Sequence, residues 1–159
     1  MTTIEKEEAR QDGGGLRLDR QICFALYSAS SSVTRRYRPL LEPLGLTYPQ
    51  YLVMLVLWEK TPRTVGELGE ALGLDSATLT PLLKRLEAGG LVSRKRDPAD
   101  ERRVLVEPTA RGAALRERAK AIPKAMACQL PLSQDELINL HGTLNRLSRS
   151  LRELERRPG

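Results

Sequence analysis

The sequence predicts an all-α fold with a small β-wing. Two short helices joined by a tight turn are expected between residues 64 and 88, and two β-prone runs follow them directly. Long amphipathic helices are expected on either side of this block. Of the 159 residues, 40% are hydrophobic and 29% are charged, so residues 16–159 have the length of one domain and enough apolar side chains to bury a core.

The first long helix is expected over about residues 16–41. Leu18, Ile22 and Ala25 begin a series of apolar or small residues that recurs every three or four positions until Pro39 interrupts it. Residues 1–15 mix both charges, end in three glycines and have no apolar period, which is typical of a flexible tail.

Three helices are expected next, at the start of a segment over about residues 47–108. Capping-box pairs, in which a Thr is followed three residues later by Gln or Glu, open helices at Thr47 and Thr64. The first of these is apolar on all sides and is therefore expected in the centre of the core. Either Asp75 or Ser76 caps the third helix. The second and third helices, joined by about three residues, form a helix-turn-helix.

A basic hairpin follows the third helix and turns the segment into a winged helix-turn-helix. The β-prone runs 91–96 and 103–106 flank a turn at residues 97–100, so a two-stranded wing is expected. Any solvated helix presents a polar face, so the hairpin is what favours contact with DNA phosphates and base edges. The candidate DNA contacts are Ser76, Thr78, Thr80, Lys84 and Arg85 on the helix, and Arg94, Lys95, Arg96, Arg102 and Arg103 on the hairpin.

The remaining helices, over about residues 110–157, are expected to form a homodimer. Thr109 and Ser133 cap helices, and Pro123 and Pro131 must bend or end the first of them. In the last helix leucines recur at alternating steps of three and four residues, a pattern that suits a partner helix better than a monomeric core. They are Leu137, Leu140, Leu144, Leu147, Leu151 and Leu154.

Charge and cysteine content narrow the classes of function. The chain carries 26 Lys and Arg against 20 Asp and Glu, a net charge of +6 that favours a polyanion as partner. No apolar run is long enough to span a bilayer and no signal peptide is present, so a cytoplasmic protein without membrane contact is expected. With one His and two Cys that lack a CxxC spacing, no metal site and no cofactor are expected.

The two cysteines are candidates for redox chemistry. Cys23 lies near the start of the first helix, where unpaired N–H groups and the helix dipole favour a thiolate. Most lone cysteines are buried and inert, but all four tyrosines lie in the first third of the chain, and phenols donate hydrogen bonds to thiolates. Tyr27 follows Cys23 by one turn, whereas Tyr37 and Tyr48 approach it if helices fold back or pair across a dimer. Cys128, at a helix end, is placed where it can be exposed and act as a second thiol.

Several segments resemble the MarR family of transcriptional regulators, in particular its organic-hydroperoxide-sensing branch (OhrR type). They are LTYPQYLVMLVLW at residues 46–58, LDSATLTPLLKRL at 74–86 and DERRV at 100–104, and DRQICFALY at 19–27 matches that branch's motif around a sensing cysteine. The resemblance is strong over about residues 16–112 and rests on pattern alone in the C-terminal helices. It also matches Arg102, oriented by Asp100, to the arginine at the tip of the wing.

This resemblance implies a MarR-like homodimer with interlocking N- and C-terminal helices and one winged lobe per subunit on half of a pseudopalindromic operator in double-stranded DNA. It implies a repressor that releases the operator when an organic hydroperoxide oxidises Cys23, the peroxidatic thiol. It further implies that Tyr37 and Tyr48, one or both from the other subunit, donate hydrogen bonds to the Cys23 thiolate, with Tyr27 nearby. Cys128 of the other subunit resembles the resolving cysteine of a two-cysteine subclass.

Two other functions stay open. A MarR-type repressor relieved by a small aromatic ligand in the dimer cleft would leave both cysteines inert. A thiol peroxidase would carry its basic surface incidentally, but the sequence has no compact βαβ pattern, and an enzyme is therefore not expected.

Overall fold

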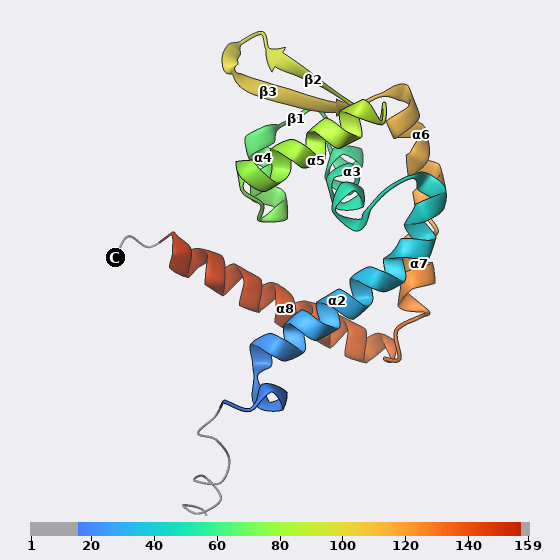
Figure 1. Ribbon diagram of the computed structural model, residues 1–159, viewed down its shortest axis with the longest axis vertical. Coiled ribbons are helices and arrows are strands. Elements are labelled where there is room, and N and C mark those ends of the chain that lie inside the picture. Colours follow the sequence, from blue (N-terminus) through green and yellow to red (C-terminus); the bar gives the residue numbers. More distant parts are fainter. Residues whose placement is uncertain (1–15, 157–159) are drawn as a thin grey trace, which may run out of the picture. The chain divides into compact units, whose positions relative to one another are not determined.

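The computed structural model describes residues 16–156 and divides into two compact units between Ile122 and Pro123 (Figure 1). Residues 1–15, for which a tail is predicted, and residues 157–159 lie outside the described part. The elements of the first unit are η2 (Leu18–Arg20), α2 (Ile22–Leu41), η3 (Glu42–Leu44), α3 (Tyr48–Glu59), β1 (Arg63–Thr64), α4 (Val65–Leu72), α5 (Ser76–Ala88), β2 (Val92–Asp97), β3 (Asp100–Pro108) and α6 (Ala110–Ala119). Helix α7 (Ile122–Ala127) begins at the boundary, and α8 (Gln134–Glu155) lies in the second unit. The predicted fold class is confirmed.

The first long helix starts later than its apolar pattern indicates. Leu18–Arg20 form a short 3-10 turn, and α2 begins at Ile22 after Gln21, whose backbone is extended and whose side chain does not cap the helix. At its other end, α2 continues past Pro39 to Leu41, because a proline in the last turn removes only one helical hydrogen bond.

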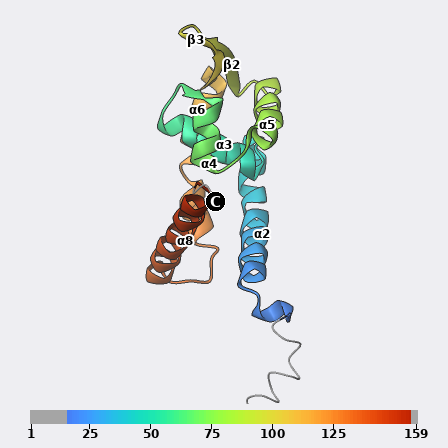
Figure 2. The same cartoon turned by 90° about the vertical axis from the view of Figure 1, so that its left-hand side faces the viewer.

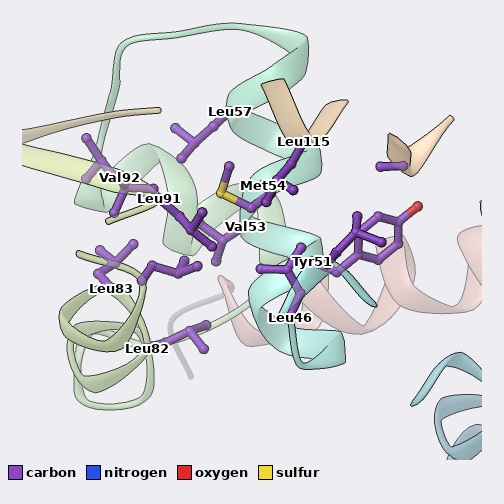
Figure 3. Packing of buried hydrophobic residues seen from close by; sticks show 14 of the residues in the cluster. Leu46, Tyr51, Val53, Met54, Leu57, Leu82, Leu83, Leu91, Val92 and Leu115 are labelled. Carbon is purple, nitrogen blue, oxygen red and sulfur yellow. The ribbon is translucent and has the colours of Figure 1, made fainter. Parts of the chain in front are cut away.

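Helix α3 lies in the core, as predicted. Its capping box is present, with the Thr47 N–H donating to Gln50 Oε1 (2.9 Å). Figure 3 shows Val53 and Met54 of α3 packed among leucines from α5, the start of the wing and α6. The helix is not buried on every side, since Leu55 is 40% exposed.

Within residues 16–156 no single helix is both long and apolar enough to cross a membrane. Only the segments Ile22–Leu44 and Tyr48–Glu59 taken together meet that criterion, across a bend of 68°, and the second of them supplies four buried side chains to the core.

The helix-turn-helix is built by local capping. Both hydrogen bonds of the capping box at Thr64 start α4, and Gly73 ends it in the left-handed conformation (φ 65°). Asp75, rather than Ser76, caps α5: its Oδ1 accepts from the Thr78 N–H at 2.7 Å. Ser76 is therefore the first helical residue and stays available on the helix surface.

The wing belongs to a three-stranded antiparallel sheet of order β1-β3-β2, so the prediction of two strands was incomplete. Strand β1 pairs Arg63 with Val106 and Thr64 with Leu105. Two residues are too few to show an alternating pattern, which is why the sequence did not reveal this strand. Figure 2 shows the β2–β3 hairpin projecting beyond α5.

The C-terminal region forms three helices. Thr109 Oγ1 accepts from the Gly112 N–H (3.1 Å) at the start of α6, and a complete capping box at Ser133 starts α8. Pro123 is accommodated in the first turn of α7, whereas Pro131 lies between α7 and α8. Of the six predicted leucines on α8, Leu137 is half-buried and the others are exposed: Leu140, Leu144, Leu147, Leu151 and Leu154. Their exposure leaves this face available to a partner, and the dimer stays a prediction.

Candidate DNA interface and thiol site

Helix α5 is amphipathic, with one apolar, buried face and one polar, mostly exposed face. Its leucines 79, 82, 83 and 86 are buried in the core. The polar candidates lie on the other side: Ser76, Thr78, Lys84 and Arg85 are exposed, and Thr80 is half-buried. The structure therefore leaves this face free to enter a groove of DNA.

A hollow of about 550 Å³ lies between α5, the start of α4 and the hairpin. It brings together five of the predicted residues: Ser76, Thr80, Arg94, Arg102 and Arg103. Lys84, Arg85, Thr78, Lys95, Arg96 and Asp100 do not line it. Sequence reasoning missed the other residues that line it, which are Thr64, Val65, Gly66, Leu83 and Val104. The capping box at Thr64 was the signal that placed a helix start here.

Four of the five basic side chains on the hairpin are paired with carboxylates of the same chain. The pairs are Arg94 with Glu87 (2.9 Å), Lys95 with Glu107 (2.7 Å), Arg102 with Asp100 (3.1 Å) and Arg103 with Asp97 (3.7 Å). The paired cation, through its hydrogen bond, lowers the pKa of Glu87, Glu107 and Asp100 below the ordinary carboxyl value. Within residues 16–156, Arg96 is the basic side chain of the hairpin without a carboxylate partner. DNA phosphates must therefore share most of these cations with internal carboxylates.

Arg102 occupies the tip of the wing, and its side chain is 92% exposed. Asp100 Oδ1 accepts hydrogen bonds from both the Arg102 backbone N–H and Nε, each at 3.1 Å. This double contact restricts the direction of an otherwise solvated guanidinium.

The Arg94 side chain is bound within the protein and is not fully free to contact DNA. Its Nε and Nη2 both donate to Glu87 Oε2 in the last turn of α5. The pair therefore joins α5 to β2, and fewer donors of the Arg94 guanidinium are left to contact DNA than the sequence alone indicated.

Cys23 is the second residue of α2, and its thiol is free and exposed. Its backbone N–H belongs to the first helical turn, whose N–H groups have no acceptor within the helix. Tyr27, one turn further along, is 71% exposed. The thiol thus has the predicted place at a helix start, on an open surface.

The other predicted tyrosines gather at the opposite end of α2. The ring centroids of Tyr37 and Tyr48 are 4.7 Å apart, and those of Tyr37 and Tyr51 are 6.0 Å apart. Burial raises the pKa of Tyr37, Tyr48 and Tyr51 above the ordinary phenol value, and for Tyr37 the proximity of Tyr48 adds to the rise. These phenols are therefore protonated at neutral pH and can donate hydrogen bonds.

Within one chain, the structure separates Cys23 from Tyr37 and Tyr48. Because α2 is continuous from Ile22 to Leu41, the fourteen steps from Cys23 to Tyr37 span about 21 Å along its axis. Tyr48 lies with Tyr37 at the far end. Neither phenol can hydrogen-bond the Cys23 sulfur of its own chain.

A second hollow, of about 600 Å³, lies beside Tyr48, between the C-terminal half of α2 and the start of α3. Its lining includes Leu46, Pro49 and the two basic residues Arg35 and Arg38. Sequence reasoning did not predict it, although the cluster of arginines around Tyr37 was a visible signal.

Cys128 follows the last residue of α7 and is exposed, which is compatible with the role of second thiol considered from the sequence. Its backbone N–H donates to the Lys124 carbonyl oxygen (3.1 Å). Within residues 16–156, no cluster of three or more His, Cys, Asp or Glu side chains is arranged to hold a metal ion.

Comparisons with known proteins agree with this architecture. A family model described as transcriptional regulator SarA/Rot matches residues 35–118. The organic hydroperoxide resistance transcriptional regulator of Bacillus subtilis (strain 168) is 46% identical over 138 residues, which cover 87% of this chain and 94% of that protein.

Two solved structures are also similar. Reduced AbfR bound to DNA, a protein of Staphylococcus epidermidis, has a TM-score of 0.72 and 34% identity over 97% of this chain and 99% of its own. AbfR has further been solved overoxidised on DNA and in a disulfide form. A mutant MarR from E. coli complexed with operator DNA has a TM-score of 0.71 and 28% identity over 77% of this chain and 90% of its own. This chain belongs to the MarR family of DNA-binding transcriptional regulators, in its branch of organic hydroperoxide resistance regulators.

Proposed function

We propose that the protein is a repressor that binds a pseudopalindromic operator as a homodimer and leaves it when an organic hydroperoxide oxidises Cys23. The observation that carries the proposal is an exposed thiol in the first turn of α2, in a chain whose α5 and wing present an open polar and basic surface. A function on operator DNA places the protein in the cytoplasm.

On DNA, α5 enters the major groove and the wing follows the adjacent backbone. The hydroxyls and cations of the exposed α5 face contact phosphates and base edges. Arg102, held by Asp100, enters the minor groove, where a narrow groove enhances the negative potential. Two lobes of the dimer contact half-sites about 34–36 Å apart, one turn of the double helix. The AbfR structures bound to DNA support DNA binding by a chain of this fold.

The Cys23 thiolate is held by phenols of the other subunit. Tyr37 and Tyr48 of its own chain are too far away, so the hydrogen bonds come from the partner's Tyr37 and Tyr48, which are protonated at neutral pH. The exposed leucines of α8 supply the apolar contact that holds the two chains together.

The sensing step is a two-electron oxidation of sulfur. The Cys23 thiolate attacks the terminal oxygen of the hydroperoxide, so that an S–O bond forms and the O–O bond breaks. The alkoxide leaves and takes a proton from a neighbouring phenol or from water, giving the alcohol and a sulfenic acid. The Cys128 thiol then attacks the sulfenic sulfur, so that a disulfide forms and water leaves.

The disulfide is the step that releases DNA in this proposal. It requires the two Cα atoms to lie about 4.4–6.8 Å apart, which ties the start of α2 to the end of α7 and shifts the two α5 helices of the dimer out of register with the half-sites. AbfR has been solved on DNA both reduced and overoxidised, which supports the view that oxidation of a single sulfur is not sufficient.

The hollow beside Tyr48 favours a second candidate, a repressor relieved by a small aromatic ligand. Anisotropy titrations of a labelled operator with cumene hydroperoxide and with salicylate separate the two functions. We expect the hydroperoxide to release DNA and dithiothreitol to restore binding, with no release by salicylate. Release by salicylate, together with binding that persists under hydroperoxide, would support the ligand-sensing function instead.

A further inference from the structure

The hollow of about 600 Å³ between the C-terminal half of α2 and the start of α3 has no role so far in the proposed sensing of hydroperoxides by Cys23. We propose that it selects hydroperoxides that also carry a carboxylate, and that Arg38 binds this carboxylate. The inference rests on the proposed function and names the class of oxidant that the protein prefers.

The hollow suits the hydrocarbon body of such a molecule. Its size lies within the range of about 300–1,000 Å³ typical of small-molecule sites. Leu46, Pro49 and the ring of Tyr48 line it, so apolar surface is available for a hydrocarbon group.

The charges of the lining favour an anionic group on the ligand. Arg35 and Arg38 line the hollow, with Glu42 as the acidic residue beside them. Arg35 Nη2 already donates to Ser32 Oγ (3.1 Å). The Arg38 guanidinium has no hydrogen bond or ion pair with any residue in 16–156, although Glu42 follows it by one helical turn. A guanidinium with all its donors available binds a carboxylate through two parallel hydrogen bonds.

The position of the hollow connects it to the thiol chemistry. Tyr48 lines the hollow, and its ring centroid also lies 4.7 Å from that of Tyr37, with the two rings tilted by 41°. In the proposed dimer these two phenols face the partner's Cys23. A bound molecule can therefore hold its carboxylate at Arg38 and its O–O bond near that sulfur, and this orientation raises the rate of the first oxidation step.

The test compares two forms of one small oxidant, 4-carboxycumene hydroperoxide and its methyl ester. The rate of Cys23 oxidation is measured on Cys128→Ser protein, in which sulfenic acid formation is isolated. We expect the acid to react about tenfold faster than the ester, the low end of what a charge-assisted hydrogen bond supplies. Arg38→Gln should bring this ratio to about one and leave the ester rate unchanged.

Arg36→Gln is the matched control, since Arg36 is exposed on the same helix but does not line the hollow. Arg36→Gln should leave the ratio of the oxidation rates by the acid and by the ester unchanged. 4-Isopropylbenzoate has the same carboxylate but no peroxide, so it should compete for the site and slow the oxidation of Cys23 by 4-carboxycumene hydroperoxide. This measurement uses protein with Arg38 intact and therefore does not depend on how the Arg38→Gln variant folds.

Each contrary outcome is distinct. Equal rates for acid and ester, a ratio that survives in Arg38→Gln, or no protection by 4-isopropylbenzoate would overturn the carboxylate site while leaving peroxide sensing intact. If unsubstituted cumene hydroperoxide also fails to oxidise Cys23, the proposed function and this inference fall together.

Discussion

The position of Cys23 at one end of α2, with Tyr37 at the other, makes a prediction about which subunit activates each thiol. The separation of about 21 Å along the helix is too large for a tyrosine side chain to bridge. In a homodimer that carries Tyr37→Phe and Tyr48→Phe, the thiolate loses two hydrogen bonds to a charged group, each worth about 1.5–3 kcal/mol. Since about 1.4 kcal/mol corresponds to a tenfold change, we expect Cys23 oxidation by cumene hydroperoxide to slow by at least about tenfold.

A mixed dimer then shows whether the tyrosines act across the interface. One subunit carries Cys23→Ser and keeps both tyrosines, while the other keeps Cys23 and carries both Phe substitutions; different affinity tags allow the mixed dimer to be isolated. We expect its single Cys23 to react at nearly the wild-type rate, because the tyrosines of the other subunit face it. As a control, adding both Phe substitutions to the Cys23→Ser subunit should keep the mixed dimer slow. A first mixed dimer as slow as the doubly substituted homodimer would refute the arrangement.

Four other substitutions test DNA binding, core packing and disulfide formation. Arg102→Ala should weaken operator binding by about 1–3 kcal/mol in anisotropy titrations, and unchanged affinity would argue against a wing in the minor groove. Gly112→Ala would place a Cβ 1.9 Å from the Leu91 carbonyl oxygen, so we expect the free energy of unfolding in urea to fall by about 3 kcal/mol. Gly66→Ala, where there is room for a Cβ, should raise it by about 0.5–1 kcal/mol. Equal stabilities of the two variants would contradict this packing. Peroxide-treated wild type should run as a covalent dimer on a non-reducing gel, and Cys128→Ser as a monomer. Cys128→Ser should also release DNA more weakly when it is oxidised. A wild type that stays monomeric on the gel would rule out an intersubunit disulfide.

The features that the sequence predicted well are those set within a few residues. Capping boxes at Thr47, Thr64 and Ser133 placed helix starts, because both partners of each hydrogen bond lie within four residues. The start of α2 was placed too early, because the apolar period continues through η2 although the backbone of Gln21 is extended.

The features that the sequence did not predict depend on partners far apart in the chain. The pairing of Lys95 with Glu107 follows from the register of β2 on β3, and that of Arg94 with Glu87 from how the wing packs on α5. The hollow beside Tyr48 forms only where α2 and α3 converge. By contrast, the distance between Cys23 and Tyr37 could be predicted from the sequence, because both residues lie on one continuous helix.

Anisotropy with a labelled fragment from upstream of the protein's own gene measures whether oxidation that begins at Cys23 releases the operator. Reduced wild type and Cys23→Ser should bind this fragment with the same Kd. Stoichiometric cumene hydroperoxide should raise the wild-type Kd at least about tenfold, dithiothreitol should restore it, and Cys23→Ser should not respond. Release of Cys23→Ser by the same hydroperoxide, or a wild type that stays bound after its Cys23–Cys128 disulfide has formed, would contradict this mechanism of release.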